Sequence, residues 1–327
     1  MGKRSLPAPF LAQPAPQLTA QVHAALLQWY RAHQRDLPWR STTDAYAILV
    51  SEIMLQQTQV ERVQPKYSQF LAAFPTLADL AAAPTAEVIR VWVPLGYNSR
   101  AVRLQSIARQ VLAEFGGQIP ASIDELLRLK GIGRYTAGAI ACFAYHQQVA
   151  TVDTNIYRVL HRIFLGLEHP EPRITTEQMF TFAEQVLPPG EAYNWNQALM
   201  DLGATICASA NPQCARCPMQ EQCQAYRDLS QYSLFPGGEV LRQLRKVAEP
   251  KTPYETKPFT TTSRYFRGRI IDHLRSLQPE QRITLANLGP ILKANYSEAD
   301  CAWLLKLVQG LAKDGLLDFQ EEGVRLP

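Results

Sequence analysis

One glutamate stands where a carboxyl group could act as an acid. Glu52 lies in TDAYAILVSEIMLQQ (residues 43–57), a segment with helical spacing, and its neighbours on that helix, Ile48, Leu49 and Leu55, are all apolar. Apolar surroundings disfavour the charged form of a carboxyl group and raise its pKa. Glu52 is therefore either a core carboxylate with a satisfied hydrogen bond or an acid that can donate a proton near neutral pH.

A second carboxylate, Asp153, follows a tight turn between two predicted helices. The turn contains Gly131 and Gly133 in GIGRYTAGAI, and the helix after it directs free N–H groups toward the same place. Such a turn is either an anion site, for which a DNA phosphate is a suitable anion, or an ordinary glycine-containing turn of an αα-hairpin. Asp153 would then lie beside the sugar attached to the bound phosphate. Alternatively, Asp153 is simply the N-cap of the helix in TNIYRVL.

Four of the six cysteines fall within seventeen residues, at Cys207, Cys214, Cys217 and Cys223. In a reducing compartment this spacing indicates a metal site rather than a disulfide framework. Zinc sites usually take their ligands from two Cys-x-x-Cys pairs, whereas only one such pair is present here. The pattern therefore favours a four-iron iron–sulfur cluster, in which each iron takes one thiolate.

Composition limits the class of protein. With 327 residues, 46% hydrophobic residues and a net charge of +4, the chain is expected to be largely globular, to contain two or more domains and to tolerate a nucleic-acid partner. No apolar run reaches the roughly 18 residues of a membrane span, so no membrane partner is expected. Residues 1–17 contain four prolines and predict a disordered lead-in rather than a signal peptide, which predicts a cytoplasmic protein.

The elements that must position these residues are predicted to be helices. Apolar residues recur at helical spacing in four further stretches, residues 18–33, 58–115, 154–165 and 174–206. Between the first two, RDLPWR places Trp39 and Arg40 after a helix-breaking proline, either as packing or as a wall for a nucleobase. Arg100 follows Tyr97 on a predicted helix, either on a solvated face or along a phosphate backbone.

The C-terminal third has a different pattern. Residues 229–262 are rich in Pro, Gly and Thr, carry several basic residues and predict a linker. Helical spacing then returns in residues 263–277, 284–294 and 297–315, and LLDFQEEGVRLP alternates as in a small hairpin. Three helices and a hairpin indicate a winged-helix-like module over residues 263–327.

The motifs together resemble those of one enzyme family. LPWR, SEIMLQQTQV, LGY, GIGRYTAGAI, VDTNIYRV, NQALMDLGATIC and the four-cysteine loop follow one another as in adenine DNA glycosylases of the MutY type, within the helix-hairpin-helix (HhH-GPD) superfamily. The resemblance covers residues 18–228. It implies an all-α, two-lobed HhH-GPD fold with an iron–sulfur loop at residues 207–223, to which this chain adds the winged-helix-like module.

The resemblance implies a role for each matching residue in the chemical step. Glu52 would protonate the purine at N7, so that the base leaves as a neutral molecule. Asp153 would stabilise the positive charge that grows on the deoxyribose, as carboxylates do in glycoside hydrolysis. Tyr135 would assist at the sugar, and Asn155 would orient the catalytic water and Glu52.

The remaining matching residues would bind DNA. Gln57 and Tyr97 would wedge into the duplex from which the adenine is flipped. Gly131 and Gly133 would form the phosphate-binding turn. Three further positions match those that surround the extruded adenine in the family, namely Trp39, Arg40 and Gln197.

The resemblance also predicts the reaction, the cofactor and the partner. Bifunctional endonuclease III-like enzymes carry a lysine at the position of Tyr135 to form a Schiff base, so hydrolysis without strand cleavage is expected here. The expected cofactor is a [4Fe-4S] cluster held by the four loop cysteines. The expected partner is double-stranded DNA with an adenine mispaired with guanine or 8-oxoguanine, bound by a monomer at the cytoplasmic nucleoid.

The chain departs from the family pattern at three points. Asn98 replaces a frequent second tyrosine, Thr154 replaces the glycine of Asp-Gly-Asn, and the C-terminal region does not resemble the MutT-like domain that reads 8-oxoguanine. Two alternatives remain open, a mismatch thymine or uracil glycosylase and a non-catalytic, DNA-binding or redox-sensing iron–sulfur protein. The QQTQV run after Glu52 favours adenine, and the two carboxylates with Tyr135 favour an enzyme.

Overall fold

The computed structural model describes residues 14–167, 174–233 and 258–327. Over these residues it is almost entirely helical, which confirms the expected all-α class. The chain divides into two compact units, of which only the described residues are characterised. The first unit comprises residues 1–45, 121–127 and 132–252, and the second comprises residues 46–120, 128–131 and 253–327. Most of the expected lead-in and linker lies outside the described residues.

The first unit is built around the helix α11 (Ala192–Thr205). Against it pack α1 (Pro16–His33), α8 (Arg134–Phe143) and α9 (Thr154–Leu160). Val22, Leu26 and Tyr30 recur every four residues on α1 and are buried, so the amphipathic pattern explains the packing face. The other elements of this unit are the short helix η2 (Pro38–Arg40), α7 (Ile123–Arg128), the π-helical turn η3 (His161–Leu165), α10 (Thr176–Gln185), η4 (Cys214–Arg216) and α12 (Gln224–Ser233).

The second unit begins with α2 (Ala45–Leu55). Nine consecutive residues of this helix, 46–54, are buried, so the helix has no solvated face over that length. The helices that follow it are α3 (Val60–Ala73), α4 (Leu77–Ala82), α5 (Thr85–Val91) and α6 (Ser99–Phe115). Helix α6 packs against both α4 and α5.

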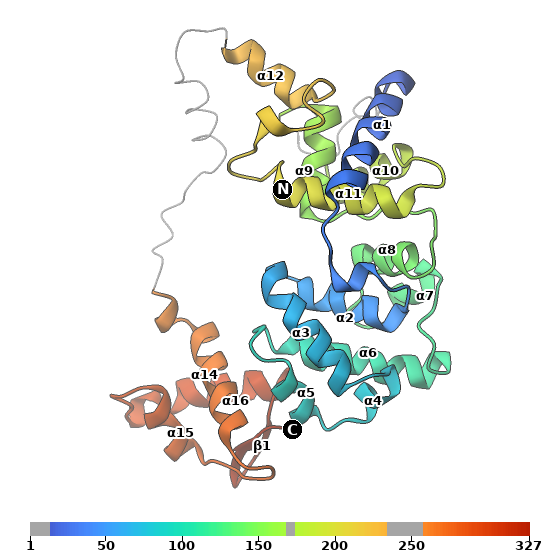
Figure 1. Cartoon of the computed structure of the whole chain (residues 1–327). Coiled ribbons are helices and arrows are strands. Elements are labelled where there is room, and N and C mark those ends of the chain that lie inside the picture. The colour runs from blue at the N-terminus through green and yellow to red at the C-terminus, as the bar shows by residue number, and fades with distance from the viewer. Residues whose placement is uncertain (1–13, 168–173, 234–257) are drawn as a thin grey trace, which may run out of the picture. The chain divides into compact units, whose positions relative to one another are not determined.

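The C-terminal module has the predicted three helices and hairpin (Figure 1). They are α14 (Ser263–Ser276), α15 (Leu285–Leu292), α16 (Cys301–Lys313, preceded by the turn η6, Glu298–Asp300) and the antiparallel strands β1 (Asp318–Gln320) and β2 (Gly323–Arg325). Its core contains Ile270, Ile271, Leu274, Leu288, Leu292, Leu304, Val308, Leu311 and Val324.

The module belongs to the second unit rather than standing apart from it. Ile89 of α5 is fully buried in the module's apolar core, and the backbone N–H of Ala86 donates to the carbonyl of Pro327 at 2.9 Å. Among the described residues, no helix is both long enough and apolar enough to cross a membrane.

Candidate functional site

Glu52 is buried on α2, with 6% of its surface exposed. Ile48 and Leu49, one turn before it, are buried as well, and Leu55 is half-buried. The predicted apolar setting of this carboxyl group is therefore present.

Two loops of the second unit end in exposed polar side chains on left-handed backbone. Gln57 follows α2 with a φ of 56°, and Tyr97 precedes α6 with a φ of 45°. Both side chains are exposed, Tyr97 by 38%. A residue other than glycine with positive φ is uncommon and costs on the order of 1–3 kcal/mol. The surrounding structure must therefore hold these two residues in place.

Arg100 joins the two loops. Its Nη1 donates to the carbonyls of Met54 at 2.8 Å and Ile53 at 3.2 Å, and also to that of Gln56. Its Nη2 donates to Thr58 Oγ1 at 2.9 Å and to the carbonyls of Leu95 and Gly96 at 3.1 and 3.2 Å. One planar guanidinium thus satisfies backbone carbonyls in the segment before Gln57 and in the segment before Tyr97.

The expectation that Arg100 lies on a solvated or phosphate-binding face is wrong, because its side chain is buried. Burial, with the neighbouring charge of Arg103, lowers the pKa of Arg100 to about 10. Sequence analysis could not reveal this burial, since the carbonyls that Arg100 satisfies come from two loops about forty residues apart.

The turn between α7 and α8 has the two predicted glycines in different roles. Gly131 has a φ of +103°, and a Cβ at this position would collide with the side chain of Arg103. Gly133 is the N-cap of α8, makes no side-chain cap, and would have open space around a Cβ. The first N–H groups of α8 therefore receive no cap from a side chain of the N-cap residue, as the predicted anion site requires. Tyr135 is half-buried in the first turn of α8.

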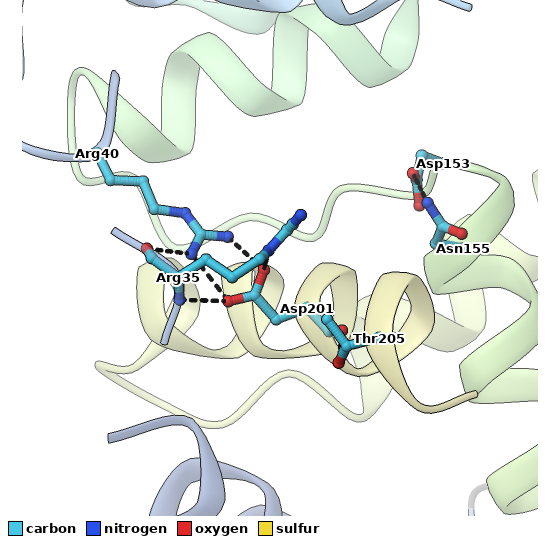
Figure 2. A network of polar contacts seen from close by, with 6 residues as sticks. All are labelled: Arg35, Arg40, Asp153, Asn155, Asp201 and Thr205. Carbon is cyan, nitrogen blue, oxygen red and sulfur yellow. Dashed lines mark hydrogen bonds and ion pairs between the residues drawn. The ribbon is translucent and has the colours of Figure 1, made fainter. Parts of the chain in front are cut away.

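Asp153 is the N-cap of α9, as the second interpretation of the sequence predicted. Its Oδ1 accepts a hydrogen bond from the N–H of Ile156 at 2.7 Å, and its Oδ2 accepts one from Asn155 Nδ2 at 3.1 Å (Figure 2). Burial raises the pKa of Asp153, although these hydrogen bonds and the charge of Arg158 act in the opposite direction. The N-cap role and the predicted catalytic role of Asp153 are compatible, because the same carboxylate caps the first turn of α9 and is poorly solvated.

Arg158 extends this network toward the cysteine loop. Its Nη2 donates to Asn155 Oδ1 and to the carbonyl of Gly203, both at 2.8 Å, and its Nε donates to the carbonyl of Cys207 at 2.8 Å. Gly203 allows this approach, since a Cβ there would lie 2.8 Å from Cβ of Asn155. The orientation of Asn155 is thus tied to the start of the loop by a residue that sequence analysis did not single out.

Arg40 is held by an aspartate that the sequence analysis also missed. Its two terminal nitrogens donate to the two oxygens of Asp201 at 2.8 Å, and Arg35 Nε donates to the same carboxylate at 2.6 Å (Figure 2). Burial opposes the charge of both partners, but their pairing prevails, so that the pKa of Arg40 is raised and that of Asp201 is lowered. Arg40 therefore serves at least as an anchor of the η2 turn on α11.

The ion pair between Arg40 and Asp201 places Trp39, Arg40 and Gln197, the three predicted pocket residues, on one part of the first unit. Asp201, Gln197 and Tyr193 follow one another at four-residue spacing on α11, and Tyr193 Oη donates to the carbonyl of Arg40 at 3.1 Å. Trp39 and Gln197 are both buried, at 8% and 5% exposed. The turn that carries Trp39 is thus fixed on the helix that carries Gln197.

The four loop cysteines line one cavity of about 120 Å³, together with Arg162, Pro212 and Tyr226. Burial raises the pKa of Cys217 to about 12 and that of Cys223 to about 11. Arg162 lies 3.5 Å from the Cys207 sulfur through Nη1, so one cation already faces the thiols. No His, Cys, Asp or Glu group of the described residues is gathered to hold a single metal ion. Four thiols around one cavity fit a cluster in which each thiolate takes its own iron.

The predicted site residues are divided between the two units. The second unit holds Glu52, Gln57, Tyr97 and Gly131. The first unit holds Trp39, Arg40, Gly133, Tyr135, Asp153, Asn155, Gln197 and the four cysteines. Within the first unit the structure brings Asp153 together with Asn155, the η2 turn together with α11, and the four cysteines together with one another.

Comparison with known proteins places the chain in a family. Residues 50–185 match the HhH-GPD superfamily of base excision DNA repair proteins. An adenine DNA glycosylase of Mycolicibacterium smegmatis is 39% identical over 303 residues, 91% of this chain and 96% of that protein. The human adenine DNA glycosylase is 42% identical over 225 residues, 66% of this chain, and the chain spans only 41% of the human protein.

A solved structure agrees with these matches. A thermostable thymine-DNA glycosylase is 31% identical, with a TM-score of 0.61 over 65% of this chain and 98% of that chain. The match with the Mycolicibacterium protein covers too much of this chain to end at residue 228, so it extends into the C-terminal module. The chain belongs to the MutY-type adenine DNA glycosylase family of the HhH-GPD base excision DNA repair superfamily.

Proposed function

We propose that the chain hydrolyses the N-glycosidic bond of an adenine mispaired with guanine or 8-oxoguanine in double-stranded DNA. The observation that carries the proposal is the burial of Glu52, the only acidic residue in α2, among apolar neighbours. Residues 18–228 would form the catalytic region, residues 229–262 a basic linker and residues 263–327 a module that adds affinity for DNA. The protein would act as a monomer at the cytoplasmic nucleoid.

The chemistry divides between two carboxylates. Glu52 protonates adenine at N7, so that the departing base carries no negative charge. Asp153 balances the positive charge on the deoxyribose, which is the oxocarbenium-like part of the transition state. Asn155, which donates to Asp153 Oδ2, keeps that carboxylate oriented and positions the water. Tyr135 assists at the sugar from the first turn of α8.

The adenine must leave the duplex before this chemistry can occur. Gln57 and Tyr97, exposed on their left-handed loops, enter the space that the base vacates and offset an unstacking cost of a few kcal/mol. The turn of Gly131 and Gly133 binds the neighbouring phosphate. The base is received between the η2 turn with Trp39 and the helix with Gln197.

The proposal is tested by a single-turnover assay. Duplexes with A:G, A:8-oxoG, A:C and T:G pairs are incubated with excess enzyme, and each released base is quantified. Adenine release from the A:G and A:8-oxoG duplexes is expected, with no nick in the strand until alkali is added. Borohydride should trap no covalent adduct, because Tyr135 cannot form the Schiff base that a lysine would form. Release of thymine alone would contradict the proposal and support a mismatch thymine glycosylase.

We also propose that Cys207, Cys214, Cys217 and Cys223 hold a [4Fe-4S] cluster that stabilises the loop. Protein purified without oxygen is expected to contain about four iron and four sulfide per chain. Cys217→Ser should lower both values, whereas Cys301→Ser, at an exposed cysteine outside the loop, should leave them unchanged. One zinc per chain without sulfide would contradict the assignment.

Arg100 is expected to act as a positioning residue for Gln57 and Tyr97. Arg100→Lys keeps the charge, but a single ammonium cannot donate to both loops, and stranded carbonyls should lower the free energy of unfolding by about 2 kcal/mol. The affinity for an A:G duplex should fall about tenfold, which corresponds to about 1.4 kcal/mol. The measurements are denaturant unfolding and fluorescence anisotropy.

A structural role alone would weaken the binding of matched and mismatched duplexes alike. The ratio of the dissociation constant for the matched duplex to that for the mismatched duplex therefore distinguishes positioning from a purely structural role. This ratio should fall in Arg100→Lys. Arg90→Lys, a half-buried arginine on α5, is the control and should leave both stability and the ratio unchanged. An unchanged ratio in Arg100→Lys would mean that Arg100 only stabilises the unit.

A further inference from the structure

A groove of about 830 Å³ lies in the second unit, between the C-terminal module and the loop that carries Tyr97. One side is formed by residues 93–99, including Tyr97 and Asn98. The other side is formed mainly by α14, the first helix of the module. Arg264, Gly268 and Arg275 line the groove from this helix, and their spacing of four and seven residues puts them on one face.

The module's basic side chains contact the Tyr97 loop directly. The guanidinium carbon of Arg264 lies 4.0 Å from the ring centroid of Tyr97. Arg275 Nη2 donates to Asn98 Oδ1 at 2.8 Å, which gives a use to the residue that replaces the family's second tyrosine. Arg264, 167 residues further along the chain, thus lies beside the tyrosine assigned to enter the duplex.

The charge of the groove is positive. Four arginines line it, and Asp272 is its one carboxylate among the described lining residues. Asp272 pairs with Arg275, and Arg267 pairs with Asp314. Arg269 donates to the carbonyls of Ile291 and Leu292, which leave its charge uncompensated.

Arg264 is the arginine best placed to meet a ligand. It is exposed, and none of the ion pairs among the described residues involves it. Among the described residues, its guanidinium carbon lies over two aromatic rings, that of Tyr97 at 4.0 Å and that of Phe259 at 5.9 Å from the centroid. Arginine beside aromatic rings is the chemistry of nucleic-acid grooves, where phosphate takes the charge and bases or sugars take the rings.

Gly268 leaves the middle of α14 open to the groove. A Cβ at this position would meet no atom within 4 Å, so a ligand can approach the helix backbone there. Glycine is a poor helix former, and its presence within a fourteen-residue helix makes room on the groove face.

We propose that this groove binds the sugar–phosphate backbone of a DNA strand next to the base pair at which Tyr97 enters, with Arg264 in contact with a phosphate. The inference rests on the proposed function for the identity of the substrate. It gives the C-terminal module a role different from reading 8-oxoguanine, because phosphate contacts carry no sequence information. The module would supply affinity at the place where the duplex is opened.

The test uses a pair of substitutions that differ only in charge. Gly268→Glu and Gly268→Gln place side chains of the same size in open space, and both residues favour helix more than glycine does. In the full-length protein, Gly268→Glu should raise the Kd for a 30-base-pair A:G duplex about tenfold, and Gly268→Gln should keep it within about twofold. Arg264→Ala should lower the slope of log K against log salt by about one, whereas Lys306→Ala, on α16 outside the groove, should not change it.

The outcomes separate this inference from the proposed function, because Kd is measured without turnover. If Gly268→Glu binds weakly and Gly268→Gln binds normally while no adenine is released, the groove stands and the reaction assignment falls. If adenine is released but the Glu and Gln variants bind DNA equally, the groove inference is overturned. Thermal unfolding of each variant shows whether it is folded, and Arg264→Ala, at an exposed side chain, decides if Gly268→Glu does not fold.

Discussion

Glu52→Gln is expected to lower the single-turnover rate constant for adenine release by about 10²–10⁴-fold, the usual contribution of a positioned general acid. Glutamine has the size and hydrogen-bonding capacity of a protonated glutamic acid but cannot give up a proton. Since Glu52 is buried within α2 rather than on a DNA-facing surface loop, the affinity for a mismatched duplex should change little. The rate is measured with enzyme in excess, and affinity by anisotropy.

The control for this prediction is Glu61→Gln. Glu61 is exposed in the first turn of α3, in the same unit, so the substitution changes the net charge equally without touching an apolar site. Its rate constant should equal that of the unaltered protein. A Glu52→Gln enzyme that releases adenine within threefold of the unaltered rate would remove the proton-donor role and with it the main support for the proposed mechanism.

The apolar pattern around Glu52 was sufficient to predict its burial. The residues three and four positions from Glu52 on the helix are apolar, so Glu52 lies on the face that packs into the core. The structure buries nine consecutive residues of this helix. Likewise, the position of Asp153 before TNIYRVL predicted an N-cap, and its Oδ1 caps the N–H of Ile156. These predictions depend on local periodicity and on capping chemistry, which a sequence displays directly.

The C-terminal module was also predictable as a unit, since each of its helices carries its own apolar face. Its attachment was not. The contact between Arg275 and Asn98 joins residues 177 positions apart, and neither residue type by itself indicates the other as a partner. Sequence analysis therefore described residues 263–327 as a separate module, whereas the structure groups them with residues 46–120 in one unit.

The burial of Arg100 was the main error of the sequence analysis. Arg100 follows an exposed tyrosine on an amphipathic helix, a pattern typical of a solvated or DNA-binding face, but six acceptors on two loops draw it inward. Arg40 similarly pairs with Asp201, 161 residues away. Acceptors of this kind are created by tertiary structure, because loop carbonyls become unsatisfied only when the loops are buried.

The left-handed backbone at Gln57 and Tyr97 could not be predicted from residue type either. Neither glutamine nor tyrosine favours positive φ, so local propensity argues against the observed conformation. Their coincidence at both predicted wedge positions is a structural observation independent of the family motifs. Strain of this kind persists where neighbouring contacts impose it, and Arg100 provides those contacts.

Asp153→Asn is expected to make the protein more stable and far less active. Folding raises the pKa of Asp153 because burial disfavours its charge more than the surrounding hydrogen bonds favour it. At neutral pH the ionised side chain therefore costs stability, about 1.4 kcal/mol for each unit by which the pKa is raised. Asparagine carries no charge and is as good an N-cap as aspartate, so the start of α9 should be preserved.

The dependence on pH distinguishes this cause from others. A carboxyl group whose pKa is raised on folding binds its proton more tightly in the folded state, so its contribution to stability falls as pH rises from the unfolded pKa, about 3.9, through the folded one. The advantage of Asp153→Asn in free energy of unfolding should therefore be larger at pH 7 than near pH 4. Asp124→Asn, at an exposed first-turn aspartate of α7, is the control and should give no gain.

Catalysis should respond in the opposite direction. Without the carboxylate, the positive charge on the deoxyribose is unbalanced in the transition state, and the rate constant for adenine release should fall on the order of 10³-fold. Folded, more stable and inactive protein is the combination expected of a residue retained for chemistry at a cost in stability. If Asp153→Asn instead unfolds more readily at pH 7, the carboxylate stabilises α9 through capping by more than its burial destabilises the fold. The proposed loss of stability from the ionised Asp153 would then be absent.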